Sequence, residues 1–318
     1  MEQNSAAPET LIQAIRFFSD PDVCLTFLAS LRWPDGRVAC PICGSQSVTF
    51  LSEYRRWKCH TKHPRQQFSI KVGTIFEDSP IGLDKWLPAV WMLVNDKNGI
   101  SSYEVARTLG VTQKTGWFML HRIRLAMENG SLTRLRGRVE ADETFIGGKV
   151  HNMHLTKRRR VMGSRRGGAH SKAIVMGMLE RESGKVRARI IESVEGTTLK
   201  RVVRENIEGG AELITDSASG YRGLSGEFLH QWVSHMTEYV RGHVHTNGLE
   251  NFWSLLKRAI KGTYVNVEPY HLHRYVEEQA FRYNERFGKD ANRFVTALRG
   301  IVGRRITYKG LTSAAATT

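Results

Sequence analysis

The chain is short of three things: cysteine, negative charge and long apolar runs. Its 318 residues include four cysteines, too few for a disulfide-stabilised scaffold of this length. No apolar stretch reaches the roughly 18 residues of a membrane-spanning helix, and the start MEQNSAAPET lacks the basic and apolar parts of a signal peptide. These absences argue against secreted disulfide proteins and membrane proteins, and we expect a cytoplasmic protein in a reducing compartment.

Positive charge is what the chain has in excess. It contains 47 Lys and Arg against 31 Asp and Glu, which gives a formal net charge of +16. Such a surface binds phosphates through the release of counterions. The charge therefore favours nucleic acid as the partner, with a merely basic soluble protein as the alternative.

Three of the four cysteines are close together in the sequence. CPIC supplies Cys40 and Cys43, and WKCHTKHP supplies Cys59 followed by His60 and His63. Two ligand pairs joined by a β-like stretch indicate a tetrahedral zinc ribbon, in which zinc stabilises a module that has little core. We favour His63 as the fourth ligand, because a side chain adjacent to Cys59 usually cannot close the same tetrahedron. His60 is the alternative.

The segment ISSYEVARTLGVTQKTGWFMLHRIRLAM resembles a helix-turn-helix. Ser101 or Ser102 can cap a first helix that ends at Gly110, and Thr112 can cap a second. The second helix would enter the major groove, and a plain helical hairpin is the alternative. The residues expected near DNA are Gln113, Lys114 and Thr115 at the leading end, with Arg122 and Arg124 reaching the backbone.

A basic run without any acid extends from Lys149 to Lys172. It includes Lys157, Arg158, Arg159 and Arg160. Such a run is either a solvated loop or a segment that becomes ordered on the DNA backbone, and both interpretations stay open.

The second half of the chain alternates between strand-like and helical segments. The strand-like segment RVEADETF ends near Asp142, and AELITDS ends near Asp216. The order of three strands, a helix, a fourth strand and further helices matches a ribonuclease-H-like mixed sheet, in which the first and fourth strands are neighbours. We therefore expect the two carboxylates to face each other.

A helix predicted from Leu249 to Ile260 would bring a third carboxylate, Glu250, to this sheet. Asn247, Glu250 and Lys257 recur at three- and four-residue steps and share its polar face. Carboxylates repel phosphates unless a divalent cation lies between them, and Mg²⁺ prefers hard oxygen ligands. The acids therefore indicate metal-dependent chemistry on a polyanion. The alternative is that they are unrelated, with Asp216 a turn former and Glu250 an acid favoured by the helix dipole.

Several independent motifs occur in an order that is similar to a known family. DETFIGGK, TDSASGYRGL and HTNGLENFWSLLKRAIKGTY follow CPIC, KCHTKHP and the GTIFEDSP stretch at Gly73 to Pro80. Together, over about Phe27 to Arg286, they resemble a bacterial insertion-sequence DDE transposase with an N-terminal zinc ribbon. The resemblance implies a ribonuclease-H-like catalytic core, two Mg²⁺ or Mn²⁺ ions, and DNA strand transfer.

The resemblance also implies roles for individual residues. Asp142 and Asp216 would bind the two ions, and Glu250 would be the third ligand. Some members of the family have Asn in place of that glutamate, so Asn247 is the reserve ligand, because an amide oxygen can also bind a hard cation. Lys257 would contact a DNA phosphate.

The predicted fold class is α/β, a ribonuclease-H-like mixed sheet with flanking helices that is preceded by a zinc ribbon and a helix-turn-helix. The predicted divisions are an N-terminal helical segment at 1–32, the zinc ribbon at 33–80, the helix-turn-helix domain at 81–132, the catalytic domain at 133–290 and a C-terminal tail at 291–318. The predicted function is a DNA transposase that binds terminal inverted repeats as a homodimer or larger assembly, in the bacterial cytoplasm and on the nucleoid when bound. The alternatives are a DNA-binding regulator without catalysis and a nuclease without joining activity.

Overall fold

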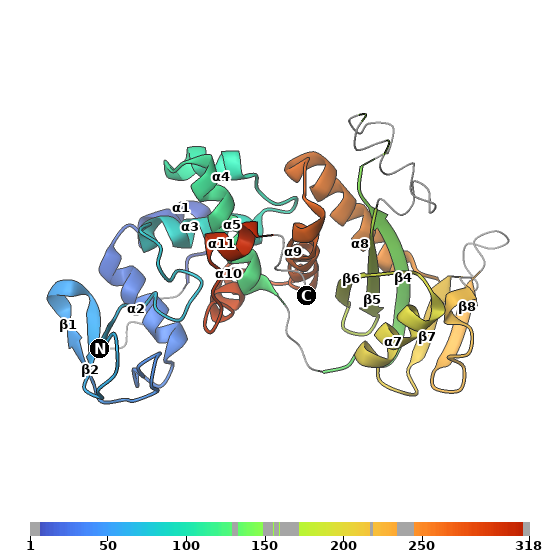
Figure 1. The fold of residues 1–318 in the computed structure, drawn as a ribbon, viewed down its shortest axis with the longest axis horizontal. Coiled ribbons are helices and arrows are strands. Elements are labelled where there is room, and N and C mark those ends of the chain that lie inside the picture. The colour runs from blue at the N-terminus through green and yellow to red at the C-terminus, as the bar shows by residue number, and fades with distance from the viewer. Residues whose placement is uncertain are drawn as a thin grey trace. The chain divides into compact units, whose positions relative to one another are not determined.

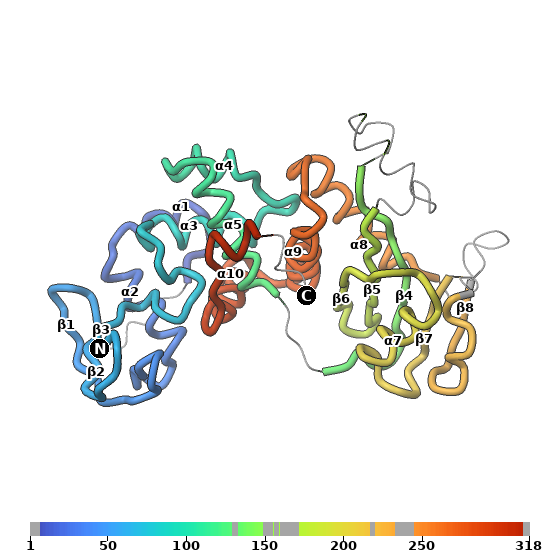
Figure 2. The backbone as a smooth tube through the Cα atoms, in the orientation of Figure 1, coloured from blue at the N-terminus to red at the C-terminus, as the bar shows by residue number. Residues whose placement is uncertain are grey.

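The computed structural model describes residues 7–128, 133–148, 155, 159, 172–216, 219–233 and 245–313. Contacts divide the chain into two compact units: Met1–Glu128 with Glu285–Thr318, and Asn129–Asn284. The backbone leaves the first unit, builds the second and returns to the first (Figure 2). The predicted five-part division stays a prediction. Among the described residues, no helix combines the length and the apolar character needed to cross a membrane.

The first unit contains a small antiparallel sheet with strand order β1-β2-β3. The strands are β1 (Val48–Leu51), β2 (Arg56–Cys59) and β3 (Gln67–Phe68). The β-like stretch between the two predicted ligand pairs forms the hairpin of β1 and β2. Trp57 is buried and stacks on Phe68 with ring centres 5.8 Å apart, so aromatic packing supplies most of the small core of this sheet.

Helices make up the rest of the first unit (Figure 1). They are α1 (Leu11–Phe17), α2 (Pro21–Arg32), α3 (Leu83–Asn95), α4 (Ser102–Leu109), α5 (Gln113–Met127), α10 (Asp290–Arg299) and α11 (Tyr308–Thr312). Phe294 of α10 is fully buried against Phe18, Phe27 and Trp91. Phe294, which falls within the predicted tail at 291–318, therefore contributes to the core of this unit.

The segment from Gly73 to Pro80 is hydrogen-bonded to the C-terminal part of the first unit. The backbone N–H of Ile75 donates to the Ile301 carbonyl over 3.1 Å, and Gly303 donates to Gly73 over 2.9 Å. Gly73 has φ of +73°, a conformation that glycine adopts without strain. The GTIFEDSP motif thus has a structural role in holding the returning chain.

The predicted helix-turn-helix is formed by α4 and α5, and its boundaries follow the expected capping residues. Ser101 caps α4 in a reciprocal capping box with Glu104. Gly110 ends α4 in the left-handed conformation, and the Thr112 side chain accepts from Thr115 N–H at the start of α5. The turn is therefore specified locally by the sequence.

The second unit is built on a five-stranded mixed sheet with order β6-β5-β4-β7-β8. The strands are β4 (Arg138–Ile146), β5 (Ala173–Glu180), β6 (Lys185–Ile191), β7 (Glu212–Asp216) and β8 (Leu229–Val233). β4, β5 and β6 pair antiparallel, whereas β7 is parallel to β4 and β8 is parallel to β7. This confirms the predicted ribonuclease-H-like class and the pairing of the first and fourth strands.

The fifth strand, β8, is absent from the sequence prediction, which had the chain turn helical after Asp216. Leu229 and Trp232 are 67% and 57% exposed on this edge strand. Its sequence, LHQWV, lacks the alternation of apolar and polar residues by which a strand is recognised.

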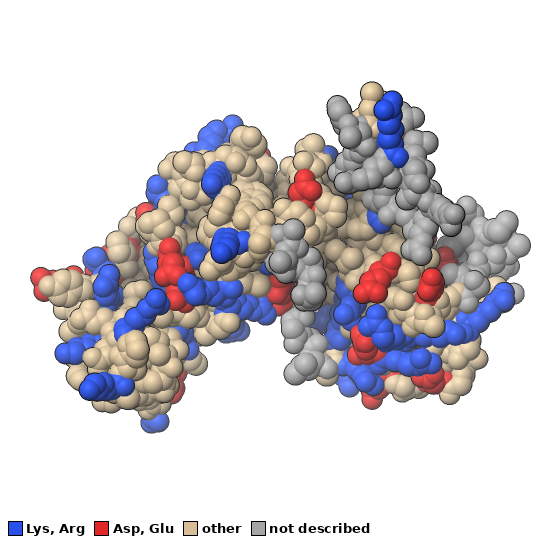
Figure 3. Space-filling model, in the orientation of Figure 1, with Lys and Arg blue, Asp and Glu red and all other residues tan. Residues whose placement is uncertain are grey.

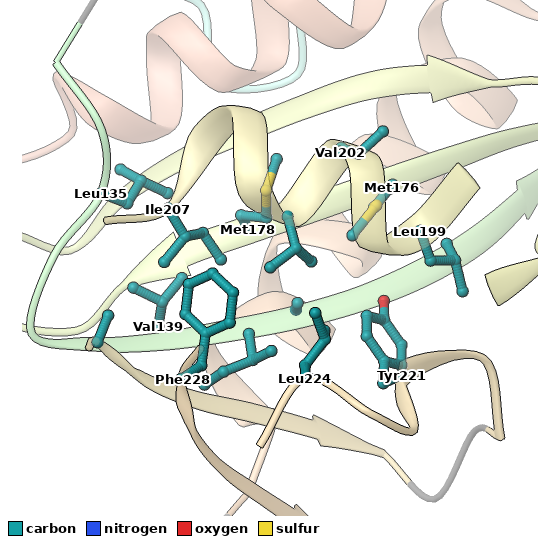
Figure 4. Packing of buried hydrophobic residues seen from close by; sticks show 14 of the residues in the cluster. Leu135, Val139, Met176, Met178, Leu199, Val202, Ile207, Tyr221, Leu224 and Phe228 are labelled. Carbon is teal, nitrogen blue, oxygen red and sulfur yellow. The ribbon is translucent and has the colours of Figure 1, made fainter. Parts of the chain in front are cut away.

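Helices cover both faces of the sheet, and each face has its own core. On one face α7 (Gly196–Asn206) packs over a cluster that includes Val139, Met176 and Leu199 (Figure 4). On the other face lie α8 (Asn247–Arg258), which continues as a π-helical turn (Ala259–Tyr264), and α9 (Leu272–Asn284). Side chains that alternate along β4 therefore point alternately toward α7 and toward α8.

A buried ion pair holds the start of α8 against β4. Glu140 on β4 pairs with Arg181 over 2.8 Å, and their side chains are 2% and 13% exposed. The other Glu140 oxygen accepts from the Leu249 backbone N–H over 3.1 Å, while Arg181 donates to the His245 carbonyl over 2.5 Å. The pair thus satisfies backbone groups at the helix start that α8 itself cannot.

We predict that Glu140→Gln lowers the free energy of unfolding by about 3 kcal/mol, because it leaves Arg181 buried without its counter-charge. Urea unfolding of the full chain measures this change. The matched control is Glu182→Gln, which removes a partner from the exposed pair between Arg138 and Glu182 and should change stability little. Equal effects of the two variants would contradict the anchoring role of Glu140.

Candidate active site and metal centre

Asp142 and Asp216 lie beside each other on adjacent parallel strands. Ala141 on β4 is in register with Thr215 on β7, and the next residue of each strand is one of the two acids. Glu140 points toward α8, so period-two alternation directs Asp142 to the same face. Ile214 is in register with Glu140, so Asp216 also leaves the sheet on the α8 face. The structure therefore brings together the two strand carboxylates predicted to face each other.

The Asp142 carboxyl is largely buried and has one side-chain donor from α8. The indole Nε1–H of Trp253 donates to its Oδ2 over 2.8 Å. Burial raises the pKa of Asp142 above its ordinary value, and this effect outweighs the hydrogen bond from Trp253, which lowers it. The negative charges of Asp216 and Glu250 raise that pKa further. A positive charge near the Asp142 carboxyl would therefore favour its ionised form.

Glu250 lies in the first turn of α8, on the side from which Trp253 reaches Asp142. Its carboxyl is exposed, and its charge acts on Asp142. Asn247, one turn earlier, is the first residue of α8 and is also exposed. Lys257 is exposed one further turn beyond Trp253. Both candidates for the third ligand therefore lie on the predicted polar face of the helix.

The three carboxylates do not form a closed ligand set. In the described part of the chain, the only group of three or more side chains with atoms placed to share one ion is a Cys and His group in the first unit. Three like charges repel one another unless a cation lies between them. The carboxylates nevertheless offer the hard oxygen donors that fit Mg²⁺ or Mn²⁺, with two of them adjacent on paired strands.

Glu143, next to Asp142 on β4, is a further buried acid that was not predicted from the sequence. It lies on the α7 face of β4, where the Tyr221 hydroxyl donates to it. Burial raises the pKa of Glu143 to about 7 against the lowering effect of that hydrogen bond, and the charges of Asp142 and Asp216 add to the increase. The sequence signal was present in the adjacent acids of ADET and in the tyrosine of TDSASGYRGL.

The metal-ligand group of the first unit consists of Cys40, Cys43, Cys59 and His63, and all four ligand atoms lie within 4.8 Å of one another. The Sγ atoms of Cys43 and Cys59 are 3.6 Å apart, and Cys40 Sγ is 3.4 Å from His63 Nε2. A zinc tetrahedron with Zn–S bonds of about 2.3 Å has edges of about 3.8 Å. The donor set and its spacing therefore fit a zinc ion.

The surroundings of the ligand group favour zinc binding by His63 over His60. His63 Nδ1 lies 2.7 Å from the Pro64 carbonyl, which can only accept, so Nδ1 carries the proton and Nε2 presents its lone pair. His60 is exposed, and its Nε2 lies 2.8 Å from the Thr49 hydroxyl. Burial would raise the pKa of Cys59, but hydrogen bonds, chiefly from His63, lower it to about 7. A thiolate is thus accessible near neutral pH.

The leading end of α5 presents polar side chains on the surface of the first unit. Gln113 and Lys114 are exposed, and Thr115 is half-buried. The Lys114 ammonium lies 4.6 Å from the centre of the Tyr308 ring. Lys and Arg side chains gather in patches on the visible face of each unit (Figure 3), which agrees with the net charge.

Arg122 and Arg124 are inside the first unit rather than on its surface. They are 4% and 1% exposed, and Arg122 donates to the carbonyls of Glu77 and Ile306. The expected phosphate contact is therefore not supported for either arginine. In the basic run, Arg159 is exposed, while Lys157, Arg158 and Arg160 lie outside the described residues.

Comparisons with known proteins agree with this arrangement. Residues 134–284 match the ISXO2-like transposase domain, and residues 19–61 match the transposase zinc-ribbon domain. A Halobacterium salinarum protein described as an uncharacterized protein in transposable element ISH50 is 28% identical over 254 residues, which cover 77% of this chain and 84% of that protein. A Haemophilus influenzae protein described as transposase-like is 29% identical over 101 residues, 31% of this chain and 81% of that protein.

A solved structure also matches, at low similarity. It is a chain of the simian T-cell lymphotropic virus intasome in complex with the PP2A regulatory subunit B56 gamma, with a TM-score of 0.26 and 13% identity over 55% of this chain and 63% of that chain. So low a TM-score carries no argument about the fold. The two family matches carry the assignment, because each falls on the part of the chain that has the corresponding geometry. The chain belongs to the insertion-sequence DDE transposases that carry an N-terminal zinc ribbon.

Proposed function

We propose that this protein is the DNA transposase of an insertion sequence, and that it cleaves and transfers DNA strands with two Mg²⁺ or Mn²⁺ ions. The observation that carries the proposal is the adjacency of Asp142 and Asp216 on paired parallel strands, with Glu250 close enough to act on Asp142. Asp142 and Asp216 hold the ions, and Glu250 completes the set. Asn247 is the reserve third ligand.

The ionised carboxylates would hold the metal ions, and the positive charge of those ions would allow the DNA phosphate to approach the acids. Bound ions would activate the attacking hydroxyl and stabilise the leaving oxygen of an in-line displacement at phosphorus. Asp142 must lose its proton to act as a ligand, and its raised pKa means that it does so most readily with a cation beside it. Lys257, exposed on the same helix, contacts a phosphate of the DNA.

The first unit is proposed to bind the terminal inverted repeats of the element. Gln113, Lys114 and Thr115 stand at the start of the second helix of a capped helix-turn-helix, where such domains contact DNA. The zinc ribbon is held by Zn²⁺ on Cys40, Cys43, Cys59 and His63. Because strand transfer joins two ends to a target, we propose a homodimer or larger synaptic assembly.

We predict that Asp142→Asn lowers Mg²⁺-dependent strand transfer at least about a hundredfold, because the amide removes a charge that holds the ion. Transfer of a labelled terminal-repeat oligonucleotide into plasmid DNA measures the effect. Glu192→Gln is the control, since Glu192 is an exposed acid of the same unit. Undiminished transfer by Asp142→Asn would refute the assignment. Cleavage without any joining by the unaltered protein would favour a nuclease, and tight DNA binding without metal-dependent cleavage would favour a regulator.

The third ligand can be identified by comparing two variants of the same helix turn. We predict that Glu250→Gln reduces strand transfer at least about a hundredfold, whereas Asn247→Ala reduces it less than about tenfold, because the charged oxygen binds the ion more strongly than the amide. Both side chains are exposed, so neither change should disturb the core. The reverse order of effects would assign the site to Asn247.

Zinc binding should require only one of the two histidines that follow Cys59. We predict that His63→Ala lowers the zinc content of the purified protein from about one ion per chain toward zero and lowers its melting temperature, because the tetrahedron loses a ligand. His60→Ala is the matched control and should keep its zinc. Metal analysis by plasma mass spectrometry distinguishes them, and loss of zinc from His60→Ala alone would reverse the assignment.

A further inference from the structure

Resting on the proposed function, we propose that Trp253 is a positioning residue that holds the Asp142 carboxylate in place for the metal ions. Its Nε1–H donates to Asp142 Oδ2 over 2.8 Å, joining α8 to β4 across 111 positions of sequence. Trp253 is 5% exposed, so water does not compete strongly for this bond. A hydrogen bond to a charged acceptor of this kind is among the stronger ones in proteins.

A glycine on the neighbouring strand makes room for the indole ring. Gly177 on β5 is in register with Asp142. A Cβ built there would lie 2.7 Å from two ring carbons of Trp253 and 2.9 Å from Leu249. Its φ is not in the left-handed region, so the backbone does not require glycine at this position. The absence of a side chain instead allows Trp253 to lie over the sheet and reach the carboxylate.

The helix does not need this hydrogen bond to stay attached to the sheet. Glu140 and Arg181 already hold its first turn, and Leu249, Phe252 and Leu256 are fully buried in the core on this face. A buried tryptophan could satisfy its N–H with a neutral carbonyl at lower cost than with a carboxylate. The hydrogen bond therefore contributes more to positioning the Asp142 carboxylate than to anchoring α8.

The position of Asp142 explains why it needs a donor. Asp216 is adjacent on β7, and the charges of Asp216 and Glu250 both act on Asp142. Like charges at such a site turn away from each other or take up protons unless something holds them. Trp253 fixes one oxygen and leaves the remaining lone pairs of the carboxylate to the cation. This arrangement resembles the outer-shell donors that orient the ligands of metal sites.

The test compares two buried tryptophans that each lose their N–H donor. Trp253→Phe should raise the half-saturating Mn²⁺ concentration, measured by calorimetric titration of the full chain without DNA, by about tenfold to a hundredfold. Trp86→Phe is the control, because Trp86 is 1% exposed and donates to the Ser79 hydroxyl over 3.0 Å in the first unit. It should bind Mn²⁺ as the unaltered protein does. Unchanged Mn²⁺ affinity in Trp253→Phe, or an equal loss in Trp86→Phe, would overturn the proposal.

A second measurement does not depend on whether Trp253→Phe folds. The chain has seven tryptophans, so a ¹⁵N-labelled sample has few indole N–H resonances to follow. In the unaltered protein, addition of Mg²⁺ should shift the resonance of the indole N–H that is hydrogen-bonded to Asp142. In Asp142→Asn, Mg²⁺ should leave that resonance unchanged. If no indole resonance responds, or if the same one responds in Asp142→Asn, Trp253 does not position a metal ligand.

A failure of the proposed role of Trp253 can be distinguished from a failure of the proposed function. If Asp142→Asn transfers strands as well as the unaltered protein, the transposase assignment of this site fails, whatever Trp253 does. If Asp142→Asn is inactive but Trp253→Phe keeps its Mn²⁺ affinity, the site stands and only the role of Trp253 is refuted.

Discussion

Two carboxylates on adjacent parallel strands are the constraint on which the second unit depends. Asp142 and Asp216 follow the registered pair Ala141 and Thr215, so the sheet itself fixes their separation. Burial raises the pKa of Asp142 and raises that of Glu143, on the opposite face, to about 7, and the charges of the neighbouring acids add to both increases. Acids placed so close together are electrostatically unfavourable without a counter-charge, which a divalent cation would supply.

The placement of α8 follows from the same sheet. Glu140, two residues before Asp142, holds the start of the helix, and Gly177, beside Asp142, lets the helix approach closely. The strand that carries the first acid therefore also determines where the third candidate ligand and Trp253 lie. One turn of this anchored helix carries both Asn247 and Glu250, and the charge of Glu250 acts on Asp142.

Local patterns in the sequence predicted a large part of this structure. The capping serine at Ser101 or Ser102, the glycine at Gly110 and the Cys spacing around Cys40 act over a few residues, and each element formed as expected. The order of strands and helices predicted the pairing of β4 with β7. Features that depend on distant partners were not predictable in this way. Arg122 is buried because carbonyls of Glu77 and Ile306 receive it, and β8 is an edge strand on which Leu229 and Trp232 are exposed.

We propose that Asp142 and Asp216 together bind a divalent cation. Anomalous diffraction from crystals of the full chain soaked in Mn²⁺ would locate such an ion. We expect an anomalous peak at bonding distance from carboxylate oxygens of both Asp142 and Asp216, with Glu250 or Asn247 completing its coordination. Mn²⁺ bound elsewhere, with these two carboxylates left unliganded, would contradict it.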